Sequence, residues 1–173
     1  MNIDRFKRDV MPLKNRFFRL AMNITLNREE AEDVVQETLL RIWKEMGDDG
    51  RETRDERAIR NVEAFGMTVC RNRALDAVTR RERRNLSLDE SEHDCVDTAI
   101  GEEERMIRDE RINSIKELMT RLPEKQRTAM MLRDVDGKNY AEIAQIMGNS
   151  EADVKVNIFR ARQKIRILLN NKQ

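Results

Sequence analysis

Carboxylate side chains recur at helical spacing in the first quarter of the chain. Glu30, Asp33 and Glu37 lie three or four residues apart, with Gln36 beside them. Paired carboxylates serve general acid–base catalysis and metal binding, but no histidine accompanies these, since the only one in the chain is His93. The pattern therefore predicts an acidic helix face, which is either simply solvated or binds a basic partner.

Arginine dominates a second string, residues 70–84. Its arginines are Arg71, Arg73, Arg80, Arg81, Arg83 and Arg84, and the acidic residues among them are Asp76 and Glu82. Guanidinium groups bind phosphates and stack on bases. The string suits a nucleic-acid surface, and a solubilising basic face is the alternative.

The third string predicts two capped helices around a glycine turn. Asn139 and Ser150 are good N-caps, each with an acidic residue at the N3 position. A short helix, a tight turn at Gly148 and a longer basic helix form the helix-turn-helix layout, whose second helix enters the major groove of DNA. A plain amphipathic hairpin with a solvated basic face is the alternative.

Helical periodicity separates two faces of that second helix. The expected buried stripe is Val154, Ile158, Ala161 and Ile165. The expected outward face is Ala152, Val156, Phe159 and Gln163, flanked by Lys155 and Arg160. An outward valine beside a lysine suits thymine methyl groups and base edges.

These strings need helices to position them, and no strand is needed anywhere. Apolar residues at three- or four-residue spacing predict a first helical segment over residues 3–24, broken or kinked at Pro12. Gly47 to about Arg60 is predicted to be a loop. Further helices are predicted near residues 27–46, 62–84, 104–121, 124–134, 140–147 and 151–169. The predicted fold class is all-α, two small helical domains joined by a flexible acidic linker.

Charge places the domain boundary. Residues 86–110 carry 10 acidic and 2 basic residues, whereas the segments on either side are net basic. The acidic segment has too few large apolar side chains to offset its ordering entropy. We predict a first domain over residues 1–85, a linker over 86–104 and a second domain over 105–173. Because phosphate binding responds to local charge, a net charge of +1 does not argue against it.

Composition bounds the remaining possibilities. No apolar run approaches the ~18 residues that a membrane span needs, and Met1 leads into charged residues rather than a signal peptide. Cys70 and Cys95 build no disulfide framework. We expect a cytoplasmic protein with no membrane insertion. His93 and Cys95 alone do not favour a zinc site, and we expect no metal or other cofactor.

Together the strings resemble the extracytoplasmic-function (ECF) sigma factors, group IV of the sigma-70 family. Residues 30–43, EAEDVVQETLLRIW, are similar to region 2.2, and residues 70–84 to regions 2.3 and 2.4. The later run resembles region 4 through Leu122-Pro123, Asp136-Gly137, Tyr140 to Ala144 and Arg160 to Arg162. The resemblance covers residues 5–84 and 105–169.

The resemblance implies a role for each string in transcription initiation. Docking on the β′ clamp helices of core RNA polymerase is implied for Asp33, Gln36, Glu37 and Arg41. Melting and reading of the −10 promoter element is implied for Arg71, Asn72, Arg73, Arg80, Arg81, Arg83 and Arg84. Reading of the −35 element is implied for Ser150, Glu151, Ala152, Asp153, Lys155, Val156, Asn157, Arg160, Arg162 and Lys164. Further implied partners are promoter DNA, the polymerase β flap and an anti-sigma factor.

Two places depart from the usual pattern of that family. The family commonly has Trp-Leu and then an aromatic residue where this chain has Phe65-Gly66-Met67, which leaves fewer aromatic rings to stack on an unpaired base. Val156-Asn157 stands where a small polar residue and an arginine are common. We therefore expect promoter preferences particular to this chain.

Other function classes explain less of the sequence. One alternative is a conventional helix-turn-helix regulator that acts without core polymerase. It gives no role to the acidic helix or to the arginine-rich string. A helical adaptor that does not bind DNA, such as an antagonist of sigma factors, predicts no salt-dependent affinity for nucleic acid. An enzyme is disfavoured, because the sequence has no nucleophile–base set, phosphate-binding glycine loop or metal cluster.

Overall fold

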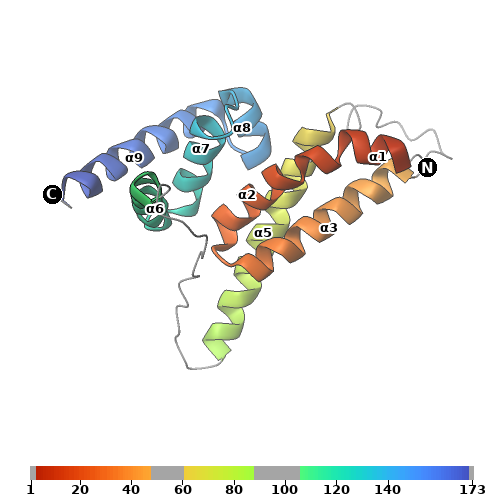
Figure 1. The fold of residues 1–173 in the computed structure, drawn as a ribbon, viewed down its shortest axis with the longest axis horizontal. Coiled ribbons are helices and arrows are strands. Elements are labelled where there is room, and N and C mark those ends of the chain that lie inside the picture. The colour runs from red at the N-terminus through yellow and green to blue at the C-terminus, as the bar shows by residue number, and fades with distance from the viewer. Residues whose placement is uncertain (1–2, 48–60, 88–105, 172–173) are drawn as a thin grey trace. The chain divides into compact units, whose positions relative to one another are not determined.

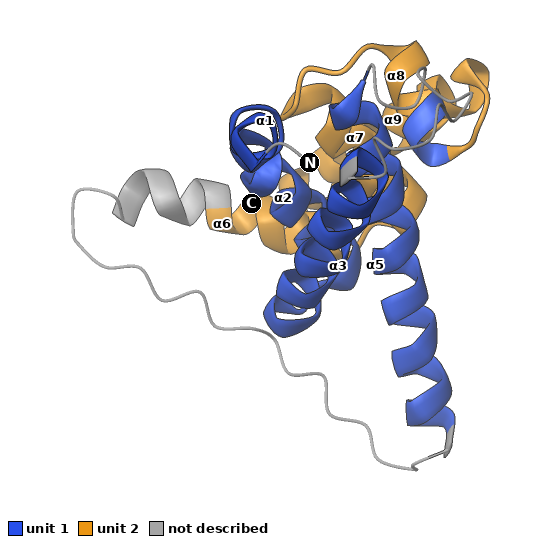
Figure 2. Cartoon of the chain, turned by 90° about the vertical axis from the view of Figure 1, so that its right-hand side faces the viewer, with its two compact units in different colours: residues 1–93, 145–147 blue, residues 94–144, 148–173 orange. Residues whose placement is uncertain are grey.

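The computed structural model describes residues 3–47, 61–87 and 106–171, and within these ranges every element is a helix (Figure 1). This confirms the predicted all-α class. The chain divides into two compact units, residues 1–93 with 145–147, and residues 94–144 with 148–173 (Figure 2). The predicted linker over residues 86–104, the pair His93 and Cys95, and nearly all of the predicted loop after Gly47 lie outside the described residues.

The N-terminal segment is interrupted at Pro12, as predicted. Helix α1 (Ile3–Asp9) is followed by a short 3-10 helix, η1 (Met11–Leu13), and by α2 (Lys14–Thr25). Proline is tolerated in the first turn of a helix because its missing amide would have no partner there. The ring of Phe6 packs edge-on against Trp43 of α3 (Arg28–Gly47), with 4.9 Å between the ring centroids.

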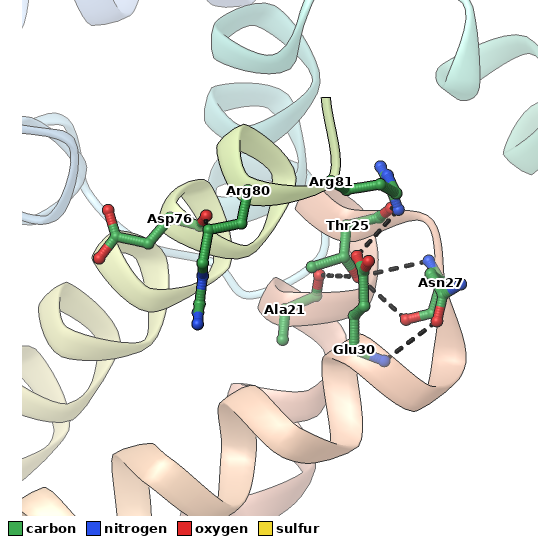
Figure 3. A network of polar contacts seen from close by, with 7 residues as sticks. All are labelled: Ala21, Thr25, Asn27, Glu30, Asp76, Arg80 and Arg81. Carbon is green, nitrogen blue, oxygen red and sulfur yellow. Dashed lines mark hydrogen bonds and ion pairs between the residues drawn. The ribbon is translucent and has the colours of Figure 1, made fainter. Parts of the chain in front are cut away.

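The turn between α2 and α3 is held by a polar network (Figure 3). Leu26 ends α2 with a φ of 53°, and Asn27 then caps α3 by accepting a hydrogen bond from the Glu30 amide at 3.0 Å. The sequence also predicts that the Glu30 carboxylate bonds back to the Asn27 amide. That part is wrong: the Asn27 amide donates to the Thr25 hydroxyl at 3.3 Å, and Glu30 accepts a hydrogen bond from Arg81.

Helices α2, α3 and α5 (Val62–Ser87) pack against one another around the core of this unit. Helical spacing in the sequence predicts Phe65, Val69, Ala74, Leu75 and Val78 as the inner residues of α5. Ala74 is buried as predicted, whereas the other four are only half-buried. The side chains that fill the core are Phe17, Leu20, Ile24, Ala31, Val34, Val35, Ile42, Met67, Cys70 and Ala74. The buried positions of α5 are thus occupied by small or flexible side chains, and its bulkier side chains are only half-buried.

Cys70 lies fully inside this core. Its thiol donates a hydrogen bond to the Phe17 carbonyl at 3.3 Å. Burial raises the pKa of the thiol to about 12, because the thiolate would lose its hydration. The side chain is therefore a protonated, inert part of the packing.

The second unit contains α6 (Met106–Thr120), α7 (Glu124–Asp134), most of α8 (Tyr140–Met147) and α9 (Glu151–Asn170). The predicted inner stripe of α9 is confirmed, since Val154, Ile158, Ala161 and Ile165 are all buried. Leu118 and Leu122 pack on the last two of these residues. The buried Arg127 donates to the Leu122 carbonyl at 2.8 Å and so closes the turn between α6 and α7.

Gly66 lies against buried side chains of α2 and α3, and alanine there is expected to destabilise the first unit. A Cβ atom at this position would lie 2.8 Å from Cε1 of Phe17 and 3.0 Å from Cδ1 of Ile42, both fully buried. We expect Gly66→Ala to lower the free energy of unfolding by about 1–3 kcal/mol, as overpacking does. Chemical denaturation followed by circular dichroism measures the change. An increase in stability, as at an exposed helical glycine, would contradict this packing.

Candidate protein- and DNA-binding surfaces

The outer face of α3 carries the residues predicted to dock on polymerase. Asp33, Gln36 and Glu37 are exposed, whereas Val34, Thr38 and Ile42 on the opposite side are buried. The Thr38 hydroxyl is satisfied inside the helix by the Val34 carbonyl at 2.7 Å. One side of α3 thus belongs to the core, and the other presents two carboxylates and an amide to solvent.

Neighbouring side chains on α3 are exposed as well. Arg41 forms an ion pair with Glu45 one turn later, at 2.7 Å. Leu40, which was not among the predicted site residues, is 58% exposed. It follows Gln36 and Glu37 by one turn and therefore shares their face. The signal in the sequence was an apolar residue that departs from the spacing of the buried stripe.

Helix α5 presents the arginine-rich string. Asn72, Arg73, Arg80, Arg83 and Arg84 are exposed along it, whereas Arg71, which the sequence also predicts to bind DNA, is buried. Arg73 also approaches the Glu37 carboxylate, with 3.7 Å between Nη1 and Oε2. A predicted DNA-binding residue and a predicted polymerase-docking residue are therefore neighbours on adjacent helices.

The guanidinium of Arg81 is bound within the unit (Figure 3). Nη1 donates to the Thr25 carbonyl at 3.0 Å and to the Glu30 carboxylate at 2.8 Å. A half-buried, charge-assisted pair of this kind fixes geometry. The contacts of Arg81 connect α5 to the α2–α3 turn, whereas Arg80 donates to the Asp76 carbonyl of its own helix, at 3.4 Å.

In the second unit, α8, the turn after it and α9 form the predicted helix-turn-helix. The capping box of α8 is complete: Asn139 and Glu142 each accept a hydrogen bond from the other's amide, both at 2.8 Å. Gly148 ends α8 with a φ of 66°, where glycine is unstrained. Ser150 then caps α9 by accepting from the Asp153 amide at 3.1 Å.

The outer face of α9 carries the residues predicted to read the −35 element. The exposed members of that set are Ser150, Glu151, Ala152, Asp153, Lys155, Val156, Arg160, Arg162 and Lys164. Asn157 is half-buried and donates to the Asp153 carbonyl at 2.9 Å. Phe159, named on the outward face but not among the site residues, is 64% exposed, against 45% for Val156. These side chains form an apolar strip bordered by basic groups, which suits thymine methyls flanked by phosphates.

Arg162 and Lys155 of the outer face of α9 contact residues of α7 and α8. Arg162 binds the Asp134 carboxylate at the end of α7 with two hydrogen bonds, of which the Nε bond is 3.2 Å long. These bonds raise the pKa of Arg162. The Tyr140 ring lies under two cations, 4.6 Å from Cζ of Arg133 and 5.2 Å from Nζ of Lys155.

Two features are absent from the described residues, a metal-binding cluster and a membrane-spanning helix. Among residues 3–47, 61–87 and 106–171 no group of histidine, cysteine and carboxylate side chains could hold a metal ion. Within the same ranges no helix is both long enough and apolar enough to cross a bilayer.

Family models match both units. Sigma-70 region 2 matches residues 10–84, and sigma-70 region 4 matches residues 112–165. The chain is 28% identical to the ECF RNA polymerase sigma factor SigE of Mycolicibacterium smegmatis over 153 residues, which are 88% of this chain but 56% of that longer protein. It is 27% identical to the ECF RNA polymerase sigma factor SigM of Bacillus subtilis, covering 90% of each chain.

Solved structures share the fold. The sigma factor RpoE of Bartonella quintana, crystallised with the anti-sigma factor NepR, has a TM-score of 0.74 at 24% identity and covers 99% of this chain and 100% of that one. CnrH, in complex with the cytosolic domain of CnrY, has a TM-score of 0.64 at 22% identity and covers 99% of this chain and 92% of that one. With region 2 and region 4 in family order and ECF factors as relatives, the chain belongs to the sigma-70 family as an ECF sigma factor, which directs promoter recognition and transcription initiation.

Proposed function

We propose that three helix faces divide the work of this sigma factor. The outer face of α3 docks on the β′ clamp helices of core RNA polymerase through Asp33, Gln36, Glu37 and Arg41. The exposed arginines and Asn72 of α5 act at the −10 element, and α9 reads the −35 element. The observation that carries the proposal is the separation of faces: on α3 and α9 the buried stripe makes the core, and the family-matching polar residues are exposed.

The chemistry of each face fits its partner. Carboxylates on α3 suit a basic protein surface, where complementary charge supports association and selects the partner. Arginines on α5 suit phosphates and unpaired bases. The apolar strip of α9 suits base edges in a groove, with Lys155 and Arg160 beside it for acceptors and phosphates.

The proposal extends to domains, partners and location. Residues 1–85 form the region 2 domain, 86–104 a linker and 105–173 the region 4 domain, which also contacts the polymerase β flap. The protein acts in the cytoplasm, where its DNA and polymerase are, and it catalyses no reaction itself. An anti-sigma factor restrains it, a partner supported by the similar structure of RpoE, which was solved with the anti-sigma factor NepR.

The central experiment is in vitro transcription with core polymerase and a randomised promoter library. We expect transcripts that depend on this chain and on defined −10 and −35 sequences. A level of promoter-dependent transcript no higher than with core enzyme alone would overturn the proposal. Specific binding of the free protein to duplex DNA, with no effect on polymerase, would instead favour a conventional helix-turn-helix regulator.

Charge reversal on α3 is expected to weaken binding to core polymerase. Asp33→Lys or Glu37→Lys places a cation against a basic partner, so we expect at least a roughly tenfold higher dissociation constant in fluorescence anisotropy without DNA. The matched control is Asp76→Lys, an equal charge change at an exposed position of α5. Equal affinities for all three variants would contradict docking through α3.

Truncation on α9 is expected to change promoter choice and leave core binding intact. Lys155→Ala and Val156→Ala remove groups from the outer face, and a lost base contact costs about 1–3 kcal/mol of discrimination. Sequencing of transcripts from the promoter library should show altered preference within the −35 element. Lys125→Ala, on an exposed position of α7, is the control. Identical −35 profiles for all variants would refute reading by these residues.

Asn72→Ala is expected to impair strand opening more than promoter binding. Its amide borders the face on which an unpaired base would be held, and removing a base from the stack costs a few kcal/mol that such contacts must offset. Permanganate footprinting should show weaker reactivity of −10 thymines at unchanged occupancy in filter binding. Asn85→Ala, exposed near the end of the same helix, should behave like the wild type. Equal loss of binding and opening would argue against this role.

A further inference from the structure

Helix α5 leaves the core of its unit before it ends. Its last buried side chain is Ala74, and Ala77 and Val78, about one turn later, are only half-buried. Every side chain from residue 82 to residue 86 is exposed, and the last turns of the helix extend past the α2–α3 turn (Figure 1, Figure 2). Apolar packing therefore does not hold this end of α5, and helix ends that lack packing open readily in water.

Arg81 attaches this end of α5 to the rest of the unit. Its guanidinium donates to the Thr25 carbonyl at the end of α2, at 3.0 Å, and to the Glu30 carboxylate in the first turn of α3, at 2.8 Å. The side chains of Arg81 and Glu30 are 32% and 20% exposed. A planar guanidinium that binds acceptors on two other helices has a fixed direction. This side chain thus connects the outlying part of α5 to α2 and α3 together.

The neighbouring arginines of α5 lie outside this network. Arg80, the residue before Arg81, points away from it (Figure 3), and Arg83 and Arg84 are exposed. The bond to Glu30 also reaches the beginning of α3, one turn before Asp33 of the proposed docking face. It therefore runs from the arginine-rich end of α5 to the helix that carries the proposed docking residues.

From this geometry we propose that Arg81 is a positioning residue for promoter binding and does not itself contact DNA. Its bonds to the end of α2 and the first turn of α3 keep the last turns of α5 helical and fix their direction. Arg80, Arg83 and Arg84 then reach promoter phosphates once α3 is docked on core polymerase. Glu30 takes part in this positioning although DNA repels its charge. The inference rests on the proposed role of the exposed α5 arginines at the −10 element.

Glu30→Gln separates positioning from DNA contact, because the two roles predict effects of opposite sign. If Arg81 bound DNA, loss of the carboxylate would release its guanidinium and remove a negative charge, so promoter affinity would rise. If Arg81 positions the end of α5, glutamine weakens its attachment and promoter affinity falls. Glutamine is also favourable at this third position of a helix, so α3 itself is little disturbed.

The experiment uses holoenzyme made from the full chain and core polymerase, bound to labelled promoter DNA in fluorescence anisotropy. We expect Glu30→Gln to raise the dissociation constant for promoter DNA roughly fivefold, as loss of a half-buried ion pair does, at unchanged affinity for core polymerase. Glu29→Gln is the matched control, an equal charge change in the same turn of α3 at an exposed position. Promoter binding by Glu30→Gln that is no weaker than by Glu29→Gln would overturn the inference.

Glu30→Arg, made with and without Arg81→Glu, tests the pairing itself. In the chain that keeps Arg81, arginine at position 30 repels it and should weaken promoter binding. In the Arg81→Glu background the same change restores an ion pair and should strengthen promoter binding. A general electrostatic effect on DNA has the same sign in both backgrounds, and that result would contradict positioning.

Hydrogen exchange in the free full-length chain supplies a readout that does not involve DNA. If Arg81 fixes the end of α5, the amides of residues 82–86 should exchange faster in Glu30→Gln than in Glu29→Gln, by about the same factor as promoter affinity falls. The amides around the buried Cys70 should be unchanged. Weaker promoter binding with no change of exchange over residues 82–86 would overturn positioning.

Failure of this inference can be told from failure of the proposed function. Arg83→Ala and Arg84→Ala should each weaken promoter binding, and if neither does, the role of α5 at the −10 element is lost and this inference with it. If both do while Glu30→Gln behaves like Glu29→Gln, only the positioning role of Arg81 is lost. Thermal unfolding checks each variant, and Glu30→Gln, which keeps the size of the side chain, decides if a charge-reversed variant does not fold.

Discussion

The contact between the Phe17 ring and the bare backbone of Gly66 sets the geometry of the first unit. It lets α5 approach α2 and α3 so closely that a single methyl group would collide with two buried side chains. Met67, Cys70 and Ala74 of α5 are buried along with Gly66. Glu37 on α3 and Asn72 on α5 are exposed.

Local chemistry explains which parts of the fold could be predicted from the sequence. Caps are decided within one turn, so Asn139 and Ser150 marked the starts of α8 and α9 correctly. The stripe from Val154 to Ile165 follows from helical spacing alone. Glu30 was assigned to its own cap and instead binds Arg81, 51 residues away. The pairing of Glu30 with Arg81 cannot be predicted from a local sequence pattern, because the two residues meet only when the chain folds.

The site was predictable in outline for a similar reason. An exposed polar residue leaves a pattern in sequence when it stands opposite a buried stripe, as Asp33 and Lys155 do. Leu40 was missed because hydrophobicity predicts burial, yet it is exposed. Phe159 was placed on the outward face, where it is exposed, but was not included among the site residues. Arg81 shows the converse: its position in an arginine-rich string predicts DNA contact, yet its bonds are to the α2–α3 turn. Composition predicts that a string of residues forms a binding surface. Only the three-dimensional packing shows which side chains of that string are exposed on the surface.

The burial of Cys70 has a consequence for oxidative stress. Peroxides and disulfides react with thiolates that they can reach. This thiol stays protonated at any physiological pH and is fully enclosed between α2, α3 and α5. While the core stays folded, Cys70 is therefore unreactive toward peroxides and disulfides in the module that carries the proposed docking and melting residues.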